Sequence, residues 1–413
     1  MRTREVIEAE AKYLVHTYSR PPLVLERGNG MHLFDTEGNR YLDFVSGIAV
    51  NALGYGDYEI LETISGQVRN LIHVSNLFYT EPQVVLAKML VERSFADRVF
   101  FCNSGAEAVE AALKFARRWG HENFSSPKVR ILAMHNSFHG RTYGALSVTG
   151  QGKYHKGFEP LLPGVDFAHF NDLESVKKVL TPQTCAIIVE PLQAEGGVVP
   201  AEGEFLWGLR ELCDERGMLL IFDEVQFGLA RSGELFAYQH YGVEPDILTL
   251  AKPLGGGLPL GAVLVREEVS QYIGPGDHAS TFGGGPLVCS VGVKVLEKLS
   301  DPKFLMKVRE NGDYLHDRLR RLKARRSEVK EVRGIGLIAG VDTEFEAKTL
   351  VEEFRKRGVL VCTAGSNTLR FLPPLIVERR HIDEVVDVFH EILEQGNADL
   401  SKGDEYGRRD GKG

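Results

Sequence analysis

Short apolar runs recur between residues 98 and 265, and each is followed by a polar segment. The clearest run, 219–222, comes after Gly217 and is bounded by Asp223. Its length and unbroken apolar character predict a strand that is buried on both faces, as in a parallel sheet. The same pattern predicts strands at 98–102, 129–134, 186–189, 247–251 and 261–265.

Apolar residues with helical spacing lie between these runs. They predict amphipathic helices at 60–71, 83–93 and 205–216. Another helix is expected to begin at Ser104, because Glu107 three residues later gives a capping-box pattern and an apolar face follows. The repeated order of strand, polar segment and helix is typical of an α/β fold with a largely parallel sheet, whose ligands bind along the edge where the strands end.

The two ends of the chain have a different pattern. Residues 3–16 have helical spacing, and 24–44 resemble a small meander of strands. Beyond residue 287, helices are predicted at 288–299, 303–323, 348–357 and 381–395, and strands at 329–342, 359–362 and 368–371. We therefore expect an N-terminal arm with part of a small domain at 1–58, a large domain at 59–287, a small α+β domain at 288–396 and a polar, flexible tail at 397–413.

One segment of the small domain matches the dinucleotide-binding fingerprint by letter. Gly334, Gly336 and Ala339 have the required spacing. The fingerprint binds a nucleotide only where it leads from a strand into a helix. Because no helical pattern follows within the next few residues, we do not assign a nucleotide site to it.

Composition limits the possible partners. The chain has 413 residues, of which 43% are hydrophobic and 26% are charged, with a net charge of −8. These values are ordinary for a soluble globular protein and argue against a general nucleic-acid or membrane surface. The N-terminus lacks an apolar signal core, and the five cysteines lack metal-ligand spacing. We expect reduced cysteines, no metal site and a cytoplasmic protein.

A carboxylate and an amine follow two of the predicted strands. Asp223 ends the run 219–222, and Lys252 leads from the run 247–251 into a proline and three glycines that leave space around the amine. This pair favours pyridoxal phosphate, whose protein partners are a lysine that forms a Schiff base and an acid facing the pyridine nitrogen. Taken alone, an Asp at a strand end more often caps a turn, and a Lys before proline is more often exposed.

Three other positions have chemistry suited to such a ligand. Gly105 and Ala106 leave amide groups uncovered at the start of a predicted helix, where a phosphate can bind. Phe138 offers a ring for stacking, and Arg141 offers a guanidinium group for a carboxylate. In isolation a plain helix cap, a core aromatic and a surface ion pair are the commoner interpretations.

Together the motifs occur in a characteristic order. They are Asn103-Ser104-Gly105-Ala106-Glu107-Ala108, Phe138-His139-Gly140-Arg141, Asp223-Glu224-Val225-Gln226, Ala251-Lys252-Pro253-Leu254-Gly255-Gly256-Gly257 and Thr281-Phe282-Gly283-Gly284. In this combination the chain resembles the class III, fold-type I pyridoxal-phosphate aminotransferases. The resemblance implies that residues 59–287 form a cofactor-binding domain with a mainly parallel, seven-stranded sheet flanked by helices. Residues 47–54, 73–76 and 370–374 resemble the acetylornithine aminotransferase branch of the class.

The resemblance assigns cofactor contacts position by position. Ser104, Gly105 and Ala106 would hold the phosphate, together with Thr281 of a neighbouring subunit, which implies a homodimer with shared active sites. Phe138 would stack on the ring, Asp223 would pair with its nitrogen, Gln226 with its phenolic oxygen, and Val225 would lie beside it. Lys252 would be both the Schiff-base lysine and the group that moves the proton.

Substrate contacts are implied in the same way. Arg370 would bind the α-carboxylate of 2-oxoglutarate, and Arg141 its second carboxylate or that of acetylornithine. Ser280 and Tyr18 would line the pocket. Glu195 would neutralise Arg370 while the amino donor is bound, which lets one pocket accept two unlike substrates. Phe227 and Gly285 depart from the class pattern near these positions. If they have an effect, we expect it on substrate range and cofactor affinity and not on the chemistry of Lys252 and Asp223.

The implied reaction moves the δ-amino group of N2-acetyl-L-ornithine to 2-oxoglutarate in two half-reactions. Ornithine, succinyldiaminopimelate, carrier-linked aminoadipate-semialdehyde and 4-aminobutyrate aminotransferases share the same catalytic residues and stay open as alternatives. An aminomutase is a further alternative, which Gln226 and Arg370 argue against. A non-catalytic protein on this scaffold is disfavoured because both Lys252 and Asp223 are present.

Overall fold

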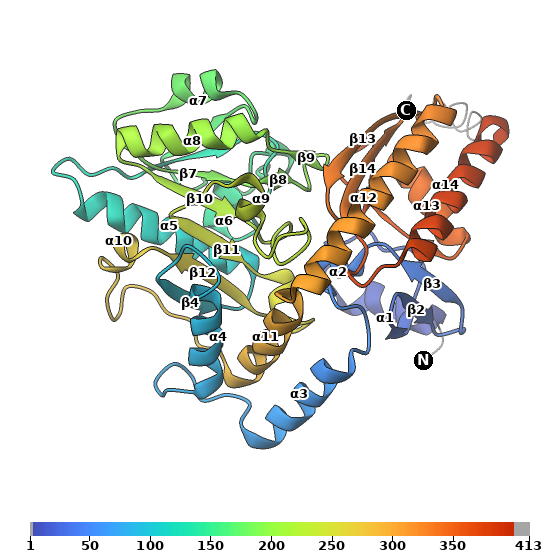
Figure 1. Cartoon of the computed structure of the whole chain (residues 1–413), viewed down its shortest axis with the longest axis horizontal. Coiled ribbons are helices and arrows are strands. Elements are labelled where there is room, and N and C mark those ends of the chain that lie inside the picture. The colour runs from blue at the N-terminus through green and yellow to red at the C-terminus, as the bar shows by residue number, and fades with distance from the viewer. Residues whose placement is uncertain (1–2, 400–413) are drawn as a thin grey trace.

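A computed structural model of the chain describes residues 3–399. The molecule has a larger part built around a central sheet and a smaller part that combines the two ends of the chain (Figure 1). The carboxyl edge of the central sheet faces the smaller part, and the candidate site lies there. Among the described helices, none has the length and apolar character needed to cross a membrane.

The central sheet has seven strands in the order β4-β12-β11-β10-β7-β5-β6. Its strands are β4 (Arg98–Cys102), β5 (Arg130–Met134), β6 (Val165–Ala168), β7 (Thr184–Val189), β10 (Leu219–Asp223), β11 (Ile247–Leu250) and β12 (Gly261–Val265). Only β12 is antiparallel to its neighbours. The connection from β11 to β12, residues 251–260, is too short for the crossover that a parallel pair needs. The prediction of a mainly parallel sheet is confirmed.

Six of the seven strands were predicted within two residues of their observed ends. The seventh, β6, lies at the edge of the sheet and was missed. Its Asp166 forms an ion pair with Arg130 of β5, so the strand has no continuous apolar run to mark it. Edge strands are exposed along one side and need less apolar sequence than central ones.

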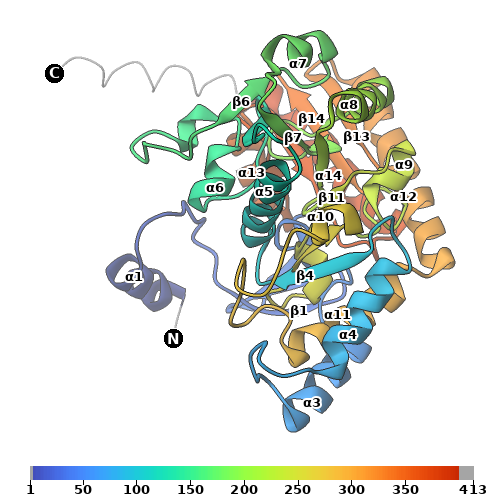
Figure 2. The same ribbon diagram turned by 90° about the vertical axis from the view of Figure 1, so that its left-hand side faces the viewer.

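Alternate residues of the central strands face opposite sides of the sheet. On β10, Leu219 and Ile221 pack in a cluster with helix α5 (Gly105–Glu122), whereas Leu220 and Phe222 pack in the cluster that contains helix α8 (Gly203–Arg216). Figure 2 shows α5 and α8 on opposite sides of the strands. Because both faces are covered, every position of the strand before Asp223 is apolar.

Shorter elements complete the larger part. They are α6 (Tyr143–Ser147), α7 (Leu173–Val179), α9 (Ala237–Tyr241), α10 (Glu267–Ser270), 3-10 turns at Gly152–Tyr154 and Lys252–Gly255, and the paired strands β8 (Leu192–Gln193) and β9 (Val199–Pro200). Helices α3 (Tyr58–Asn70), α4 (Glu81–Val91) and α11 (Pro286–Leu299) form a lower layer in Figure 1. Helix α11 packs against both α3 and α4 and leads into the smaller part.

The smaller part contains two four-stranded sheets. The first consists of β13 (Val329–Ile335), β14 (Ile338–Thr343), β17 (Thr368–Phe371) and β16 (Cys362–Thr363), and the second of β1 (Leu25–Asn29), β2 (His32–Asp35), β3 (Arg40–Asp43) and β15 (Val359–Leu360). Helices α12 (Pro302–Arg325), α13 (Ala347–Lys356) and α14 (Arg379–Asp399) accompany them. The parallel pairing of β15 with β3 joins the C-terminal segment to the N-terminal one.

The segment that matches the dinucleotide fingerprint forms a tight hairpin between β13 and β14. Ile335 pairs with Ile338, and Gly336 in the turn has a φ of +58°. A Cβ atom at Gly336 would lie 2.2 Å from the carbonyl oxygen of Arg231. The glycine therefore permits a close approach of two backbone segments, and the segment is not the strand-to-helix turn of a nucleotide site.

The terminal segments differ from the rest in burial. Helix α1 (Thr3–Tyr13) has no buried residue and projects from the body in Figure 2, and it ends three residues before the predicted 3–16. A short turn, α2 (Ser46–Ala49), follows the first strands. Of the predicted tail 397–413, the backbone is helical through Asp399, and residues 400–413 lie outside the described part.

The five cysteines are free thiols. Four are buried, and burial raises the pKa of Cys102, Cys185 and Cys289 to about 12. These thiols are therefore protonated near neutral pH and pack as small apolar groups.

Candidate active site

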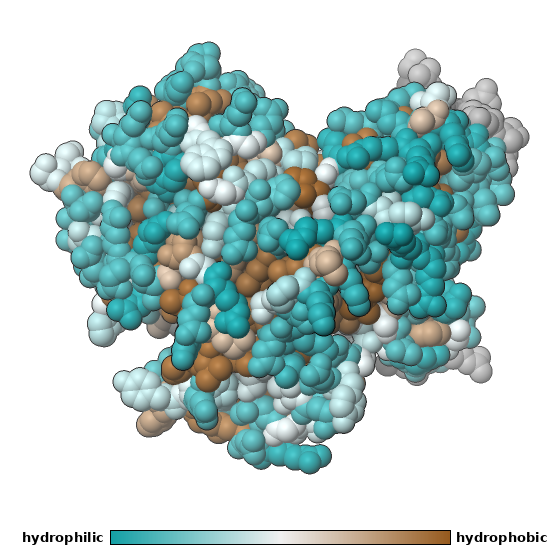
Figure 3. Space-filling model, viewed as in Figure 1, coloured by the Kyte–Doolittle hydropathy of each residue, from teal (hydrophilic) through white to brown (hydrophobic). Residues whose placement is uncertain are grey.

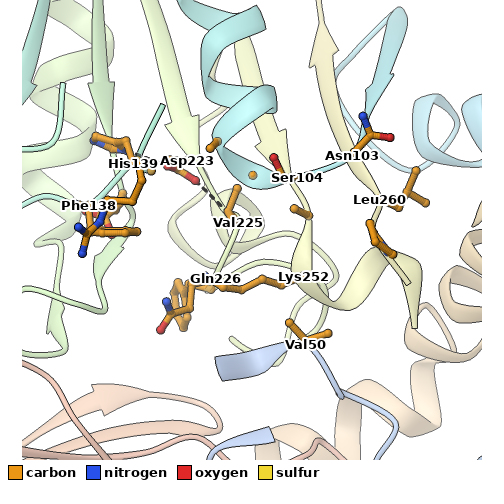
Figure 4. Close-up of a pocket in the computed structure, with 18 of the residues that line it drawn as sticks. Val50, Asn103, Ser104, Phe138, His139, Asp223, Val225, Gln226, Lys252 and Leu260 are labelled. Atoms are coloured by element: carbon orange, nitrogen blue, oxygen red, sulfur yellow. Dashed lines mark hydrogen bonds and ion pairs between the residues drawn. The ribbon is translucent and has the colours of Figure 1, made fainter. Parts of the chain in front are cut away.

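A cavity of about 450 Å³ opens where strands β5, β7, β10 and β11 end and helix α5 begins. Figure 4 shows side chains from these elements pointing into one space. Nine of the predicted site residues line it: Ser104, Gly105, Ala106, Phe138, Arg141, Asp223, Val225, Gln226 and Lys252. Its volume suits a small organic ligand.

Asp223 is a buried carboxylate at the end of β10, with 5% of its surface exposed. Its Oδ1 atom accepts hydrogen bonds from the Val225 amide at 3.0 Å and the Thr249 hydroxyl at 3.1 Å. Its Oδ2 atom lies 2.7 Å from Nδ1 of His139, which is also buried. Thr249 of β11 lies directly beside Asp223 in the parallel register, which brings its hydroxyl within hydrogen-bond distance of the carboxylate. The carboxylate is thereby fixed in one orientation, facing the cavity.

Lys252 follows β11 and begins a 3-10 turn with a φ of +37°. That conformation is strained for a residue with a side chain, and such strain concentrates at functional sites. The Nζ atom has no hydrogen bond or ion pair within residues 3–399. Burial lowers the pKa of the amine to about 8, although the carboxylates of Glu195 and Asp223 act in the opposite direction. Near neutral pH a useful fraction of the amine is thus uncharged and nucleophilic.

The start of α5 offers backbone amides to an anion. The hydroxyl of Ser104 accepts a hydrogen bond from the Glu107 amide at 3.2 Å, and the Glu107 carboxylate accepts one from the Asn103 amide at 2.5 Å. The predicted helix cap is confirmed, but its return bond goes to Asn103 instead of Ser104. The amides of Gly105 and Ala106 have no acceptor in the described part of the chain, and the helix dipole makes this end positive.

Gly105 also keeps the entrance to these amides open. A Cβ atom there would lie 2.6 Å from Cγ1 of Val225. Val225 follows Asp223 and packs directly over the helix start. The two predicted motifs, one on α5 and one after β10, are therefore adjacent in space.

Phe138 and Arg141 occupy the loop after β5. The Phe138 ring meets the Tyr154 ring edge-on, with ring centroids 5.9 Å apart. The Arg141 guanidinium lies 3.8 Å from the Tyr154 ring centroid, and no carboxylate among residues 3–399 pairs with it. Arg141 is exposed at the cavity, so its charge is available to an anionic ligand.

Two further predicted residues, Arg370 and Glu195, do not line the cavity but form an ion pair beside it. The Nη1 atom of Arg370 on β17 donates to Glu195 at 2.6 Å and to the Gln226 side-chain oxygen at 2.8 Å. Gln226 in turn donates to Glu195 at 3.2 Å, and the Arg370 Nε atom lies 3.4 Å from the Cys362 sulfur. Burial alone would raise the pKa of Glu195, but the Arg370 charge lowers it overall. The side-chain amide of Gln226 is thus hydrogen-bonded to both members of the ion pair.

Three predicted residues lie away from this cavity. Ser280 and Thr281 line a second cavity of about 890 Å³ beside α4 and β4, and Tyr18 is 72% exposed in the N-terminal segment. The Ser280 hydroxyl accepts a hydrogen bond from the side chain of Asn103, which lines the first cavity. Within one chain Ser280 is therefore a neighbour of the site, and none of the three residues lines it.

Two ionisable residues of the cavity were not assigned a role from the sequence. His139 contacts Asp223, and Glu190 follows β7 and is buried against the same space. The sequence signal for Glu190 was its place directly after a buried strand, which it shares with Asp223. His139 directly follows Phe138, but nothing in the sequence shows that its ring reaches β10. Phe227, which departs from the class pattern, is 1% exposed and packs in an apolar cluster at the cavity wall.

Comparison with known proteins agrees with this geometry. The family model for class-III aminotransferases matches residues 13–393. The chain belongs to the class-III aminotransferases. It is 46% identical over 387 residues to the acetylornithine aminotransferase of Methanocaldococcus jannaschii, covering 94% of this chain and 97% of that one. The fold is that of the fold-type I enzymes, as expected.

Solved structures of other aminotransferases superpose over nearly the whole chain. N-acetylornithine aminotransferase from Stenotrophomonas maltophilia K279a is 33% identical, with a TM-score of 0.82 and coverage of 95% of this chain and 99% of that one. Ornithine aminotransferase from Toxoplasma gondii is 30% identical, with a TM-score of 0.92 and coverage of 97% and 96%. The Toxoplasma structure has pyridoxal phosphate at partial occupancy in its active site.

Pyridoxal phosphate is the cofactor of class-III aminotransferases, and the cavity fits it. The family needs an uncommitted lysine amine, an anion site, a flat apolar wall and a carboxylate. Lys252, the amides of Gly105 and Ala106, Phe138 and Asp223 supply these groups around one space. The uncommitted amides at the start of α5 suit the phosphate of such a ligand.

The lowered pKa of Lys252 gives a test that needs no cofactor. In the cofactor-free protein, an amine-reactive acylating reagent should label Lys252 with a midpoint near pH 8, because only the uncharged amine reacts and burial disfavours the charged form. Lys294 is a suitable internal control, since its hydrogen bond to Glu297 raises its pKa. Mass spectrometry of labelled peptides across pH 6 to 11 measures both. Identical pH profiles for the two lysines would contradict the prediction.

Proposed function

We propose that this class-III aminotransferase moves the δ-amino group of N2-acetyl-L-ornithine to 2-oxoglutarate, giving N-acetyl-L-glutamate 5-semialdehyde and L-glutamate, a step of arginine biosynthesis. The observation that carries the proposal is the neutralised arginine, Arg370 paired with Glu195. Gln226 contacts both members of the pair and lines the cavity together with Lys252 and an unpaired Arg141. The acetylornithine aminotransferases at 46–48% identity over nearly the whole chain support the same assignment.

Lys252 and Asp223 carry the chemistry in this proposal. When bound, pyridoxal phosphate supplies the electron sink that makes the carbon beside the amino group acidic. Lys252 would hold the cofactor through its amine, and its Nζ atom would carry the proton that is moved in the reaction. Asp223, held by His139, Thr249 and the Val225 amide, keeps a negative charge facing the ring nitrogen. The amides of Gly105 and Ala106 hold the phosphate.

The ion pair explains how one pocket accepts two substrates. Acetylornithine approaches with an amine that is distant from its carboxylate, so a free arginine near Lys252 would favour the wrong end of an amino acid. Glu195 neutralises Arg370 during this half-reaction. 2-Oxoglutarate has two carboxylates, and its α-carboxylate takes the place of Glu195 on Arg370 while Arg141 binds the other.

Ornithine is the second candidate donor, because the Toxoplasma ornithine aminotransferase has the same fold at 30% identity. The two donors differ by the acetyl group on the α-nitrogen, which removes a positive charge beside the carboxylate. Arg141 is unpaired and exposed at the cavity, so it suits a donor whose α-substituents carry net negative charge. This charge difference favours acetylornithine.

The absorption spectrum of the cofactor-loaded protein tests the function. N-acetylornithine added without a keto acid should abolish the visible band of lysine-bound pyridoxal phosphate and leave the amino form of the cofactor, and 2-oxoglutarate should restore the band. Lys252→Ala should show no such cycle. A loaded protein that responds to ornithine or 4-aminobutyrate and not to acetylornithine would correct the donor, whereas a wild-type protein without a lysine-bound band would refute the aminotransferase mechanism.

Replacing Glu195 tests the two-substrate arrangement. In Glu195→Gln, Arg370 keeps a neighbour of similar size but loses the opposing charge, so donors such as glutamate, whose carboxylate lies beside the reacting amino group, gain access to it. We expect the ratio of single-turnover efficiencies for glutamate over N-acetylornithine to rise by about tenfold or more, because each tenfold corresponds to about 1.4 kcal/mol of differential binding. Glu202→Gln, on the exposed start of α8, is the matched control. An unchanged ratio would remove the proposed role of Glu195.

We further propose a cytoplasmic homodimer whose active sites are completed across the interface. Thr281 lies outside its own chain's cavity, beside an open second cavity. Large apolar side chains are exposed around that cavity: Leu77 at 84%, Phe78 at 69%, Tyr79 at 99% and Phe282 at 66%. Figure 3 shows more apolar surface over α3, α4 and α11. Exposed apolar groups of this number and size are typical of a surface that a partner covers.

The dimer has a direct test. Light scattering should give twice the chain mass of 45.9 kDa for the wild type. Leu77→Asp should shift the population toward monomer and weaken pyridoxal phosphate binding in parallel, because each site would lose the partner subunit. Met306→Asp, at a 48% exposed position on α12, should do neither. A monomeric wild type with full activity would contradict the proposal.

A further inference from the structure

Glu190 is a buried carboxyl group at the active site for which the proposed reaction has no use. It follows β7, the strand between Asp223 on β10 and the Phe138 loop after β5. Only 6% of its surface is exposed, yet it lines the cavity. Its Oε2 atom accepts a hydrogen bond from the Phe138 amide at 3.0 Å. This is its only hydrogen bond within the described residues.

The surroundings of Glu190 disfavour a negative charge. No Lys, Arg or His among residues 3–399 forms an ion pair with it, and one backbone amide is its single donor. Burial raises its pKa well above the usual range, and the nearby carboxylates of Asp223 and Glu195 raise it further, whereas the Phe138 hydrogen bond and the Lys252 charge only partly oppose them. By contrast, Asp223 has three donors and Glu195 has an arginine. Of the three carboxyl groups, Glu190 has the fewest means of holding a charge.

The hydrogen bond from the Phe138 amide joins Glu190 to the loop after β5, which carries the site residues Phe138, His139 and Arg141. His139, next in the chain, contacts Asp223 through its ring and donates its amide to the Thr149 hydroxyl at 2.9 Å. Gly140 follows with a φ of +135°, and a Cβ atom there would lie 2.8 Å from the Cβ atom of Ala106. The loop is therefore tied to β10 and to α5 after Phe138, and Glu190 supplies the tie at Phe138 itself.

We infer that Glu190 is a positioning residue, held as a neutral carboxylic acid, that fixes the Phe138 backbone and thereby the ring that Phe138 presents to the cofactor. This inference rests on the proposed function, since it assumes that Phe138 contacts pyridoxal phosphate. A neutral acid keeps its carbonyl oxygen as an acceptor for the Phe138 amide. It also adds no second negative charge beside Asp223. A second charge there would favour the ammonium form of Lys252.

Two substitutions separate these features. Glu190→Gln keeps the size, the neutral state and the carbonyl acceptor, so its affinity for pyridoxal phosphate should stay within about twofold of the wild type. Glu190→Leu keeps the approximate volume but leaves the buried Phe138 amide without an acceptor, which is worth about tenfold in an equilibrium. We expect its dissociation constant for pyridoxal phosphate, measured by absorbance titration of the cofactor-stripped protein, to rise about tenfold, with KM values for both substrates changed less.

Infrared spectroscopy measures the neutral state directly. The wild-type protein near neutral pH should show a protonated-carboxyl C=O band that is absent from Glu190→Gln, whether or not Glu190→Leu folds. Equal cofactor affinity in the wild type and Glu190→Leu would overturn the positioning role. The same carboxyl band in the wild type and in Glu190→Gln would overturn the neutral state. Loss of kcat in Glu190→Gln at full cofactor occupancy would show instead that Glu190 exchanges a proton during the reaction. Failure of the wild type itself to bind pyridoxal phosphate would refute the proposed function and with it the positioning role, whereas the carboxyl band would still test the neutral state of Glu190.

Discussion

The site depends on a carboxylate that is buried at the end of a parallel strand. Asp223 cannot hold its charge there without donors, because desolvation of an unpaired carboxylate costs more than most proteins can tolerate. The donors come from three segments: the Thr249 hydroxyl on β11, the Val225 amide after β10 and the His139 ring after β5. Meeting the needs of one side chain therefore fixes the relative positions of three segments, and these segments carry or adjoin the other residues of the site.

A second set of charges joins the larger part to the smaller one. Arg370 on β17 reaches Glu195, Gln226 and the Ala194 carbonyl, all in loops of the larger part. The fully buried Arg231 donates to the carbonyls of Leu337 and Pro373 across the same boundary. A substrate that takes Glu195 away from Arg370 thus acts on a contact between the two parts, so substrate exchange and the fit of the two parts are physically coupled.

The sequence could predict the sheet and the reactive pair because both leave local signals. A strand buried on both faces must be apolar at every position, and a ligand group directly after it must lie at the sheet edge, so Asp223 and Lys252 were found from the chain alone. Non-local geometry left no such signal. The reversed direction of β12, the edge strand β6, the reach of His139 to β10 and the membership of Gln226 in the Arg370 network depend on segments distant in sequence. Tyr18 lies outside the cavity of its own chain, which the periodicity of the chain does not indicate, and for Thr281 only the family resemblance implied such a position.

Three carboxyl groups and two arginines surround one lysine, and the partners of each group decide its charge. If Asp223, Glu195 and Glu190 were all ionised, their field would favour the ammonium form of Lys252 and remove the nucleophile. Pairing Glu195 with Arg370 cancels one charge, and leaving Glu190 with a single amide donor removes another. Of the three, Asp223 is the carboxyl group whose donors hold it facing the cavity, where the ring nitrogen of the cofactor pairs with an acid. The lowered pKa of Lys252 therefore depends on the whole arrangement. Burial lowers this pKa, and the small number of ionised carboxylates nearby keeps it from rising again.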